Sequence, residues 1–379
     1  MNRWDLIVIG AGAVGSAALR AASETGARVL GIEQHAPANE FGSSHGRSRI
    51  FRHAYFEHPE YIPLLRHSTA RFESLERESG ASLLHRCGML IFGPPDCGTV
   101  LGSLDSARRW GLPFETLDAR ALRRRFPWFR VVDDAVGVLE ANAGIVRPEA
   151  AVHAAIDRAT ARGAEIRSSS RALGITEDAS GVAVQTDAGA ERAAAVVVAT
   201  GPWARQLLPE LAPLLKVTRQ VQAWFRPVPG TDAAAMPCWL CDRGPQRRAV
   251  YGLAPDPAAP PGYPKVGLHG SDEIVEPDVG ARPVDATDIE SIRAACRECA
   301  PCLDGDPLDA ATCLYTMSPD GNFLVGTRSG CRRTHFAAGL SGHGFKLAPA
   351  LGDALVDLAT SGRTDLPIGF LSPNRFRSL

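Results

Sequence analysis

The segment SSHGRSRIFRHAY, at residues 43–55, gathers side chains that can bind an anion. Arg49 and Arg52 lie three residues apart, with Ser43, Ser44, His45 and Ser48 around them. Residues three apart lie on one side of a helical turn, so this spacing predicts two guanidinium groups that face the same way. Such a pair could hold a bound cofactor or the carboxylate of a substrate. Taken alone, the segment fits a solvated basic loop better.

A glycine-rich turn near the N-terminus carries a second chemical signal. Gly10, Gly12 and Gly15 form G-x-G-x-x-G directly after the apolar run at residues 6–9, and Glu33 ends the next apolar run. In this motif the first glycine allows a tight turn, the second lets the backbone approach a pyrophosphate, and the third lets helix and strand pack closely. Glu33 would accept hydrogen bonds from a ribose hydroxyl and repel a 2′-phosphate, which disfavours NADP. The motif predicts a dinucleotide site but does not separate FAD from NAD.

The cysteines suggest a metal centre that the spacing does not complete. Cys296, Cys299 and Cys302 are spaced like an iron–sulfur run, but Asp306 stands where the fourth ligand would be. A zinc site shared with the cysteine pair at 238 and 241 is the alternative. The pattern of residues 287–299 favours an ordinary helix, so we expect no metal. The nine cysteines are odd in number and lack framework spacing, which predicts free thiols in a reducing cytosol.

The elements that must position these residues follow from the apolar pattern. Residues 6–9, 10–25 and 28–33 read as a β-α-β unit with buried parallel strands. Further helices are predicted at 59–79, 149–162, 287–299 and 347–360, and further strands at 89–92, 182–185, 194–199 and 335–339. Strands and helices like those of the β-α-β unit resume at about residue 145 and again near residue 312. We therefore predict an α/β (α+β) fold with a Rossmann-like nucleotide-binding domain (1–84, 145–215 and 312–379) and an inserted antiparallel-sheet substrate domain (85–144 and 216–311).

Composition excludes several classes of protein. The 379 residues carry 41 Lys and Arg against 42 Asp and Glu, and this near-neutral balance argues against a nucleic-acid binder. No stretch reaches the ~20 apolar residues that a membrane span needs, and the first apolar run is too short for a signal peptide. We therefore expect a cytoplasmic protein that binds no nucleic acid and no membrane.

Two more stretches, TCLYTMSPDGNF at 312–323 and GLSGHGFKLAP at 339–349, identify a family resemblance. With GAGAVG and SHGRSRIFRHAY they resemble the monomeric sarcosine oxidase and N-methyltryptophan oxidase family, a branch of the flavoprotein amine oxidases related to D-amino acid oxidase. The resemblance runs over essentially the whole chain. It implies an FAD-dependent oxidase of a secondary amino acid, N-methyl or cyclic, that forms an imine. The imine hydrolyses to an amine and an aldehyde or keto product, and oxygen is reduced to hydrogen peroxide. We expect a monomer whose partners are the amino acid and oxygen.

The resemblance also implies roles for single residues. Cys313, in TCLYT, matches the cysteine that carries the flavin through a thioether. Arg52 and Lys346 match the two cations that hold the substrate carboxylate. Arg49 matches an arginine beside the flavin ring, and Lys265 matches the lysine that assists the reaction with oxygen.

Other positions follow in the same way. His269 matches a histidine near the active site, Tyr251 and Tyr315 match aromatic residues of the substrate pocket, and His343 lies in the loop by the flavin. The expected catalytic residues are Lys265, Arg49, His269 and Tyr315, and the expected substrate-binding residues are Arg52, Lys346 and Tyr251. The expected cofactor-binding residues are Gly10, Gly12, Gly15, Glu33, Ser43, Ser48, Gly201, Cys313, Gly342, His343, Gly344 and Lys346.

One departure and two alternatives stay open at this point. Family members commonly read GDTR where this chain has Gly46-Arg47-Ser48-Arg49. Arg47 inverts the charge, so it either adds a cation near the flavin or the substrate mouth, or faces solvent. An FAD- or NAD-linked amino acid dehydrogenase and a non-catalytic flavin-binding protein are the alternatives. An NAD-linked enzyme would explain the glycine motif but not Cys313 or GHGFK. The choice of amine depends on the size of the pocket.

Overall fold

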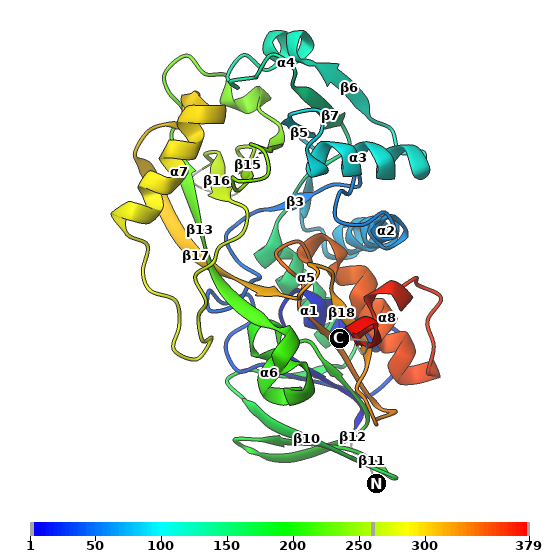
Figure 1. Ribbon diagram of the computed structural model, residues 1–379. Coiled ribbons are helices and arrows are strands. Elements are labelled where there is room, and N and C mark those ends of the chain that lie inside the picture. The colour runs from blue at the N-terminus through cyan, green and yellow to red at the C-terminus, as the bar shows by residue number, and fades with distance from the viewer. Residues whose placement is uncertain (1–3, 259–261, 377–379) are drawn as a thin grey trace.

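The computed structural model describes residues 4–258 and 262–376, which Figure 1 draws as ribbons. Two eight-stranded sheets and one three-stranded sheet organise these residues. In Figure 1 the second large sheet, with β13, β16 and β15, lies above the region that contains β10, β11 and β12. The site described below forms where the two large sheets approach each other.

The first sheet is built around β1 (Trp4–Ile9). Its neighbours β2 (Val29–Ile32) and β12 (Gly189–Val198) both run parallel to it. All residues of β1 except Asp5 are buried, because the sheet is covered on both faces. The strand order is β10-β11-β12-β1-β2-β9, with β19 beside β12 and β18 beside β19. The remaining strands are β9 (Glu165–Arg167), β10 (Ala172–Asp178), β11 (Gly181–Thr186), β18 (Leu324–Thr327) and β19 (Thr334–Ala338).

Four helices pack together beside this sheet. They are α1 (Ala13–Glu24), α2 (Tyr61–Ser79), α5 (Pro148–Ala161) and α8 (Ala348–Ser361). α1 contacts both α5 and α8, and α2 contacts α5 and α8. The approach of α8 to α1 is close, since a Cβ added at Gly352 would lie 2.7 Å from the backbone nitrogen of Ala18. Small residues on both helices therefore set the distance between them.

The second sheet has the strand order β17-β13-β16-β15-β14-β5-β7-β6. All its pairings are antiparallel except that of β14 with β5. α7 (Ala286–Cys299) packs against it, and its side chains Cys296 and Cys299 are buried in an apolar cluster with Trp239 and Phe225. The strands are β5 (Met89–Gly93), β6 (Glu115–Asp118), β7 (Val136–Glu140), β13 (Lys216–Phe225), β14 (Cys238–Cys241), β15 (Val250–Leu253), β16 (Lys265–Leu268) and β17 (Pro307–Met317).

A small third sheet carries the first arginine of the sequence motif. It consists of β3 (Arg49–Phe51), β8 (Gly144–Val146) and β4 (Leu84–His85), in the order β3-β8-β4. The predicted helical turn at residues 49–52 is therefore wrong, because the backbone of β3 pairs with β8, about a hundred positions further along the chain. α3 (Gly98–Arg109) and α4 (Ala119–Arg125) connect strands of the second sheet, and α6 (Ala204–Leu207) lies between β12 of the first sheet and β13 of the second.

The α/β fold class predicted from the sequence is confirmed, with helices and strands at the predicted places to within a few residues. The predicted boundary near 312 falls inside β17, whose full length pairs with β13 in the second sheet. The division into two domains stays a prediction. Within the described residues, no helix combines the length and apolar character that crossing a membrane requires.

The close contact of α8 with α1 gives a first prediction. Gly352→Ala should destabilise the protein by about 1–3 kcal/mol, because the added methyl group meets backbone atoms of α1 that have no room to move. The gain in helix propensity is smaller, roughly 0.5–1 kcal/mol. Denaturant unfolding measures the difference. Gly98→Ala is the control, since a Cβ there meets nothing within 4 Å. A Gly352→Ala protein as stable as the Gly98→Ala protein would contradict this packing.

Candidate active site

A cavity of about 170 Å³ opens at the carboxyl ends of β1 and β2, beside the start of α1. Seven of its lining residues are glycines, so bare backbone forms much of its wall. Gly10 has a φ of +90°, and a Cβ there would lie 2.5 Å from the carbonyl oxygen of Ala199. Gly12 also lines the cavity. Gly15 does not line it but faces the carbonyl of Gly10, with which a Cβ at Gly15 would collide. Gly15 thus serves the packing of helix on strand, as the motif predicts.

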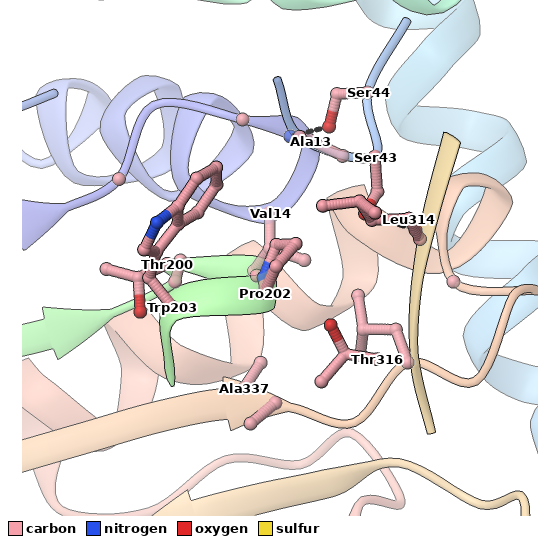
Figure 2. A pocket seen from close by; sticks show the side chains of 18 of the residues that line it. Ala13, Val14, Ser43, Ser44, Thr200, Pro202, Trp203, Leu314, Thr316 and Ala337 are labelled. Carbon is pink, nitrogen blue, oxygen red and sulfur yellow. Dashed lines mark hydrogen bonds between the residues drawn. The ribbon is translucent and has the colours of Figure 1, made fainter. Parts of the chain in front are cut away.

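Two side chains fix the glycine turn from outside it. One oxygen of the buried Glu33 accepts a hydrogen bond from the Ala11 backbone N–H at 2.7 Å, and the other accepts from the His35 N–H at 3.0 Å. Ser44 accepts a hydrogen bond from the Ala13 N–H at 3.0 Å, which Figure 2 shows as a dashed line. Ser44 belongs to the segment noted in the sequence, but it was not among the residues expected to bind the cofactor.

The cavity fits a dinucleotide. Its wall joins the start of α1, where backbone N–H groups favour phosphate, to an acid placed for a ribose. The hydroxyl of Thr200, also in the wall, is buried and has no hydrogen-bond partner within the described chain. The glycines leave room for the backbone to approach a ligand closely.

A second cavity of about 90 Å³ adjoins the first. Five residues line both cavities and mark their junction: Arg49, Cys313, Tyr315, Gly342 and Phe345. One face of the second sheet forms much of the wall of the second cavity. Gln220 on β13 stands opposite Cys313 on β17, and Leu240 on β14 stands opposite Tyr251 on β15. Directly opposed residues of antiparallel strands share a face, so the register of the sheet brings these side chains into one cavity.

Glycines make room for the two tyrosines. A Cβ at Gly267 would lie 2.5 Å from the Tyr251 phenol oxygen, and one at Gly342 would lie 2.2 Å from the Tyr315 ring. Burial raises the pKa of Tyr251 to about 12 and raises the pKa of Tyr315 well above its usual value. Both phenols therefore keep their protons at neutral pH and can donate hydrogen bonds into the cavity.

Cys313 lies next to a cation at the junction. The Arg49 guanidinium donates to the Cys313 sulfur at 3.4 Å, and its other hydrogen bonds run to the carbonyl oxygens of Ser43 and Ser48 at 3.0 and 2.9 Å. These two carbonyls fix the guanidinium beside the sulfur. The side chain of Ser43 in turn donates to the carbonyl of Leu314 at 2.6 Å, which ties this loop to β17.

The ammonium group of Lys265 is buried against a turn. Its Nζ donates to the carbonyl oxygens of Gly46 and Ser48 at 2.9 and 2.5 Å. Burial lowers the pKa of Lys265 well below its usual value, and the nearby Arg49 lowers it further. One carboxylate oxygen of Glu149 holds the turn by accepting from the Gly46 and Arg47 N–H groups at 2.7 and 2.9 Å. Sequence reasoning missed Glu149.

Arg47, whose direction the sequence left open, points away from both cavities. Its guanidinium stacks over the Trp224 ring at 4.4 Å and pairs with Asp309 of β17. Its φ of +67° places it in the left-handed region, as the tight turn requires. Arg47 therefore supports the turn that holds Lys265 rather than adding a cation to the cavity wall.

Arg52 and Lys346 both line the second cavity, and both lie near the ring of Tyr55. The Arg52 guanidinium lies 4.3 Å from the centre of the Tyr55 ring, and the Lys346 Nζ lies 5.2 Å from it. Lys346 donates to the carbonyl of His343 at 2.9 Å. Arg52 is already paired, since one of its nitrogens donates to both oxygens of Glu57 at 2.7 Å. The carboxylate of Glu57 is thus already bound to the Arg52 guanidinium. Like Glu149, Glu57 is an acid that sequence reasoning missed.

Burial and charge set the protonation of this group. Burial lowers the pKa of Lys346 to about 7 with help from Arg52, although Glu57 opposes the shift. Burial raises the pKa of Glu57, but attraction to Arg52 and neighbouring cations outweighs it and brings the pKa to about 2. Glu57 is therefore ionised at neutral pH, whereas Lys346 is close to half protonated.

The two histidines differ in what they offer to the cavity. The Nδ1 of His343 lies 2.5 Å from the Tyr55 hydroxyl, and its Nε2 lies 3.0 Å from the carbonyl of Gly321. A carbonyl only accepts, so Nε2 carries the proton and Nδ1 accepts from the tyrosine. Burial lowers the pKa of His343 to about 4, so the ring is neutral and both its nitrogens are used. His269 lines the cavity, and burial also lowers its pKa, so its imidazole is neutral.

The predicted residues divide between the two cavities. All of the residues expected to be catalytic or substrate-binding line the second cavity: Arg49, Arg52, Tyr251, Lys265, His269, Tyr315 and Lys346. Of those expected to bind the cofactor, the first cavity is lined by Gly10, Gly12, Glu33, Ser43, Gly201, Cys313, Gly342 and Gly344. Ser48, His343 and Lys346 line only the second cavity, and Gly15 lines neither. The roles of all these residues stay predictions.

The remaining cysteines build no metal centre in the part of the chain that is described. No group of three or more His, Cys, Asp or Glu side chains there is placed to hold a metal ion. Cys296, Cys299 and Cys302 are buried in the apolar cluster under α7. The described cysteines are free thiols.

Comparisons with known proteins match this chain over almost its whole length and agree with one another. Residues 5–358 match the family model described as FAD dependent oxidoreductase. The chain is 39% identical to a monomeric sarcosine oxidase of Streptomyces avermitilis, over 98% of this chain and 97% of the other. It is 35% identical to an N-methyl-L-tryptophan oxidase of Yersinia pestis, over 99% and 100%. Among solved structures, NikD, an amino acid oxidase of nikkomycin biosynthesis, superposes with a TM-score of 0.86 at 28% identity, over 98% of each chain.

The pKa of Lys346 predicts how binding of a small carboxylate depends on pH. Lys346 is mostly protonated below about pH 7 and mostly neutral above it. The dissociation constant of propionate should therefore rise above about pH 7, by up to about tenfold per pH unit, until the pKa of Lys346 in the complex is reached. Calorimetric titration across pH 6–9 measures it. In Lys346→Met the same profile should be flat, and an unchanged slope in that variant would assign the titration to another group.

Proposed function

The chain belongs to the family of FAD-dependent oxidoreductases, and we propose that it oxidises a secondary amino acid, N-methyl or cyclic, with oxygen as the electron acceptor. The observation that carries the proposal is the junction of the two cavities. A wall suited to a dinucleotide meets, at Cys313 and Arg49, a small cavity with two cations for a carboxylate. The sarcosine and N-methyltryptophan oxidase relatives support the choice of an N-substituted amino acid.

The residues of the first cavity would hold FAD as follows. The glycine turn of Gly10 and Gly12 and the start of α1 would hold the pyrophosphate, and Glu33 would accept hydrogen bonds from the ribose. Arg49 and Cys313, at the junction, would hold the isoalloxazine ring, and Cys313 is the residue that would carry it through a thioether. When bound, FAD would supply the redox chemistry, a two-electron oxidation of the substrate carbon–nitrogen bond with oxygen as the electron acceptor.

The substrate is oriented by its carboxylate. Arg52 and Lys346 bind it from two sides, while Glu57 and the carbonyl of Ala54 hold the Arg52 guanidinium in place. Two cations on one anion fix the direction of the amine as well as adding affinity. The apolar side chains Met89, Leu240 and Leu253 complete the wall around the rest of the substrate.

Proton transfer uses the neutral and protonated groups of the cavity. The amine must lose its ammonium proton before it can be oxidised, and the neutral imidazole of His269 accepts that proton. Tyr251 and Tyr315 keep their protons and donate hydrogen bonds to the substrate. Lys265 releases its proton more readily than a surface lysine and supplies it to oxygen as the electrons arrive. The products are an imine, which water hydrolyses, and hydrogen peroxide. A monomeric state and a cytoplasmic location stay predictions.

The substrate class is tested with a panel of N-methyl and cyclic amino acids and their carboxamides, assayed for hydrogen peroxide. The carboxylates should be oxidised and the amides should be poor substrates. Arg52→Ala and Lys346→Ala should each weaken substrate binding by about 10- to 150-fold, equivalent to roughly 1.5–3 kcal/mol, with a non-additive combined effect. If the acids and the amides were oxidised equally well, Arg52 and Lys346 would not bind the substrate through its carboxylate. Oxidation without peroxide would favour a dehydrogenase, and no turnover of any compound would favour a non-catalytic flavin protein.

The covalent link is tested at Cys313. The purified protein should keep its yellow colour after precipitation with acid, whereas Cys313→Ser should release its flavin. The physical reason is that a thioether needs a sulfur in the cavity wall, and among the described cysteines Cys313 is the one that lines the first cavity. Cys331→Ser, altered near the surface, is the control and should keep the colour. Acid-stable flavin in Cys313→Ser would place the attachment elsewhere.

The role of Lys265 is tested by measuring the two half-reactions apart. Lys265→Met should slow reoxidation by oxygen about 100-fold or more, because a proton donor is lost where charge develops, and should slow anaerobic reduction far less. Glu149→Ala should act in the same direction but more weakly, since it loosens only the turn that holds Lys265. The exposed Lys216 gives the control Lys216→Met. Similar slowing of both half-reactions would argue against a specific role with oxygen.

A further inference from the structure

The connection between β16 and α7 reaches from the second sheet to the first cavity. Residues 271–280 of this connection, called the strap from here on, lie along the start of β13. The Val275 N–H donates to the carbonyl of Val217, and the Arg219 N–H donates to the carbonyl of Glu273, each at 2.9 Å. Figure 1 shows the connection descending from α7 beside β13 and β17 towards α6.

The strap ends in a carboxylate that binds three donors. One oxygen of Asp278 accepts from the Trp203 indole N–H at 2.7 Å. The other accepts from the Arg171 guanidinium at 2.7 Å and from the Gln206 amide at 2.9 Å. Trp203 and Gln206 lie in the continuous segment 201–207, Arg171 directly precedes β10, and all three residues line the first cavity. A neighbouring ion pair between Glu276 and Arg205 adds a second connection to α6.

These contacts lie at the ribose end of the cavity. The Trp203 ring is 5.8 Å from the ring of His35, whose backbone N–H donates to Glu33. Figure 2 shows Trp203 and Thr200 on the opposite side of the cavity from Leu314 and Thr316. The junction with Cys313 lies at that other side, next to β17. Asp278 therefore acts on the part of the wall that faces the adenosine half of a dinucleotide.

We propose that the strap is a latch for the adenosine half of FAD. Asp278 holds Trp203, Arg171 and Gln206 together as one wall, and this wall slows the release of the dinucleotide. An isolated exposed ion pair would contribute little. Here one carboxylate accepts three hydrogen bonds and ties Arg171 and residues 201–207 to the strap. Arg171 also donates to Gln206 at 3.1 Å, so the wall is one connected unit, and the loss of Asp278 removes most of its attachment to the strap. The inference needs only FAD as the cofactor and is independent of which amine is oxidised.

The test compares FAD with FMN, which lacks the adenosine half. In the Cys313→Ser background, where the flavin is bound without a covalent link, Asp278→Ala should raise the dissociation constant of FAD at least tenfold. The constant for FMN should change less than twofold. Flavin fluorescence measures both constants, and stopped flow measures the release rate. Asp272→Ala is the matched control, because Asp272 is on the same strap but exposed and paired with Arg248 rather than with the cavity wall.

A second variant and a second measurement guard against a folding defect. Trp203→Phe keeps the ring but removes the indole donor, so it should weaken FAD binding in the same selective way by a smaller factor. In the protein that keeps Asp278, bound FAD should protect the strap from limited proteolysis, whereas bound FMN should not. Equal loss of FAD and FMN binding in Asp278→Ala, or unchanged binding of both, would overturn the latch. If no amine were oxidised but FAD binding alone fell, the latch would stand and the proposed substrate would fail.

Discussion

The arrangement of this protein depends on burying several positive charges in one small cavity. Arg52, Lys265 and Lys346 are almost inaccessible to solvent, and Arg49 lies beside them at the cavity junction. Removing such groups from water costs several kcal/mol each unless partners replace the lost hydration. The structure supplies Glu57 and Glu149 and a series of carbonyl oxygens. The lowered pKa values of both lysines show that this compensation is incomplete. A carboxylate bound in this cavity would complete the compensation, which is the role that we propose for the substrate carboxylate.

The surrounding elements are placed to meet this constraint. The turn that carries Gly46 and Arg47 presents its carbonyls to Lys265, and Glu149 at the start of α5 holds the opposite side of the turn. β17 brings Cys313 to the edge of the dinucleotide cavity, because its register with β13 sets which face points inward. The ring of Tyr55 lies against both Arg52 and Lys346 by cation–π contact. Apart from the local contact of Arg52 with Tyr55, these contacts join segments that are far apart in the chain, so the site exists only in the folded protein.

Those distances explain what the sequence could predict. The β-α-β unit was predictable because an apolar run, a glycine turn and a small-residue helix follow one another within 33 residues. The residues of the second cavity were predictable only through motif resemblance, since nothing local links Arg52 to Lys346. Glu149 and Asp278 were missed because their partners Gly46 and Arg171 lie 103 and 107 positions away. Arg49 was assigned to a helical turn because local spacing does not reveal that β3 pairs with β8. Glu57 could have been noticed, as an acid five residues after Arg52.

The most direct test of the account is an anaerobic titration of the purified protein with N-methyl and cyclic amino acids, followed by the absorbance of its flavin. The account predicts that at least one such compound bleaches the flavin in proportion to the amount added, without any nicotinamide cofactor. Admission of oxygen should then restore the absorbance and release one hydrogen peroxide for each flavin. A flavin that stays oxidised with all of these compounds, or that is reduced only by primary amines without a carboxylate, would contradict the central claim.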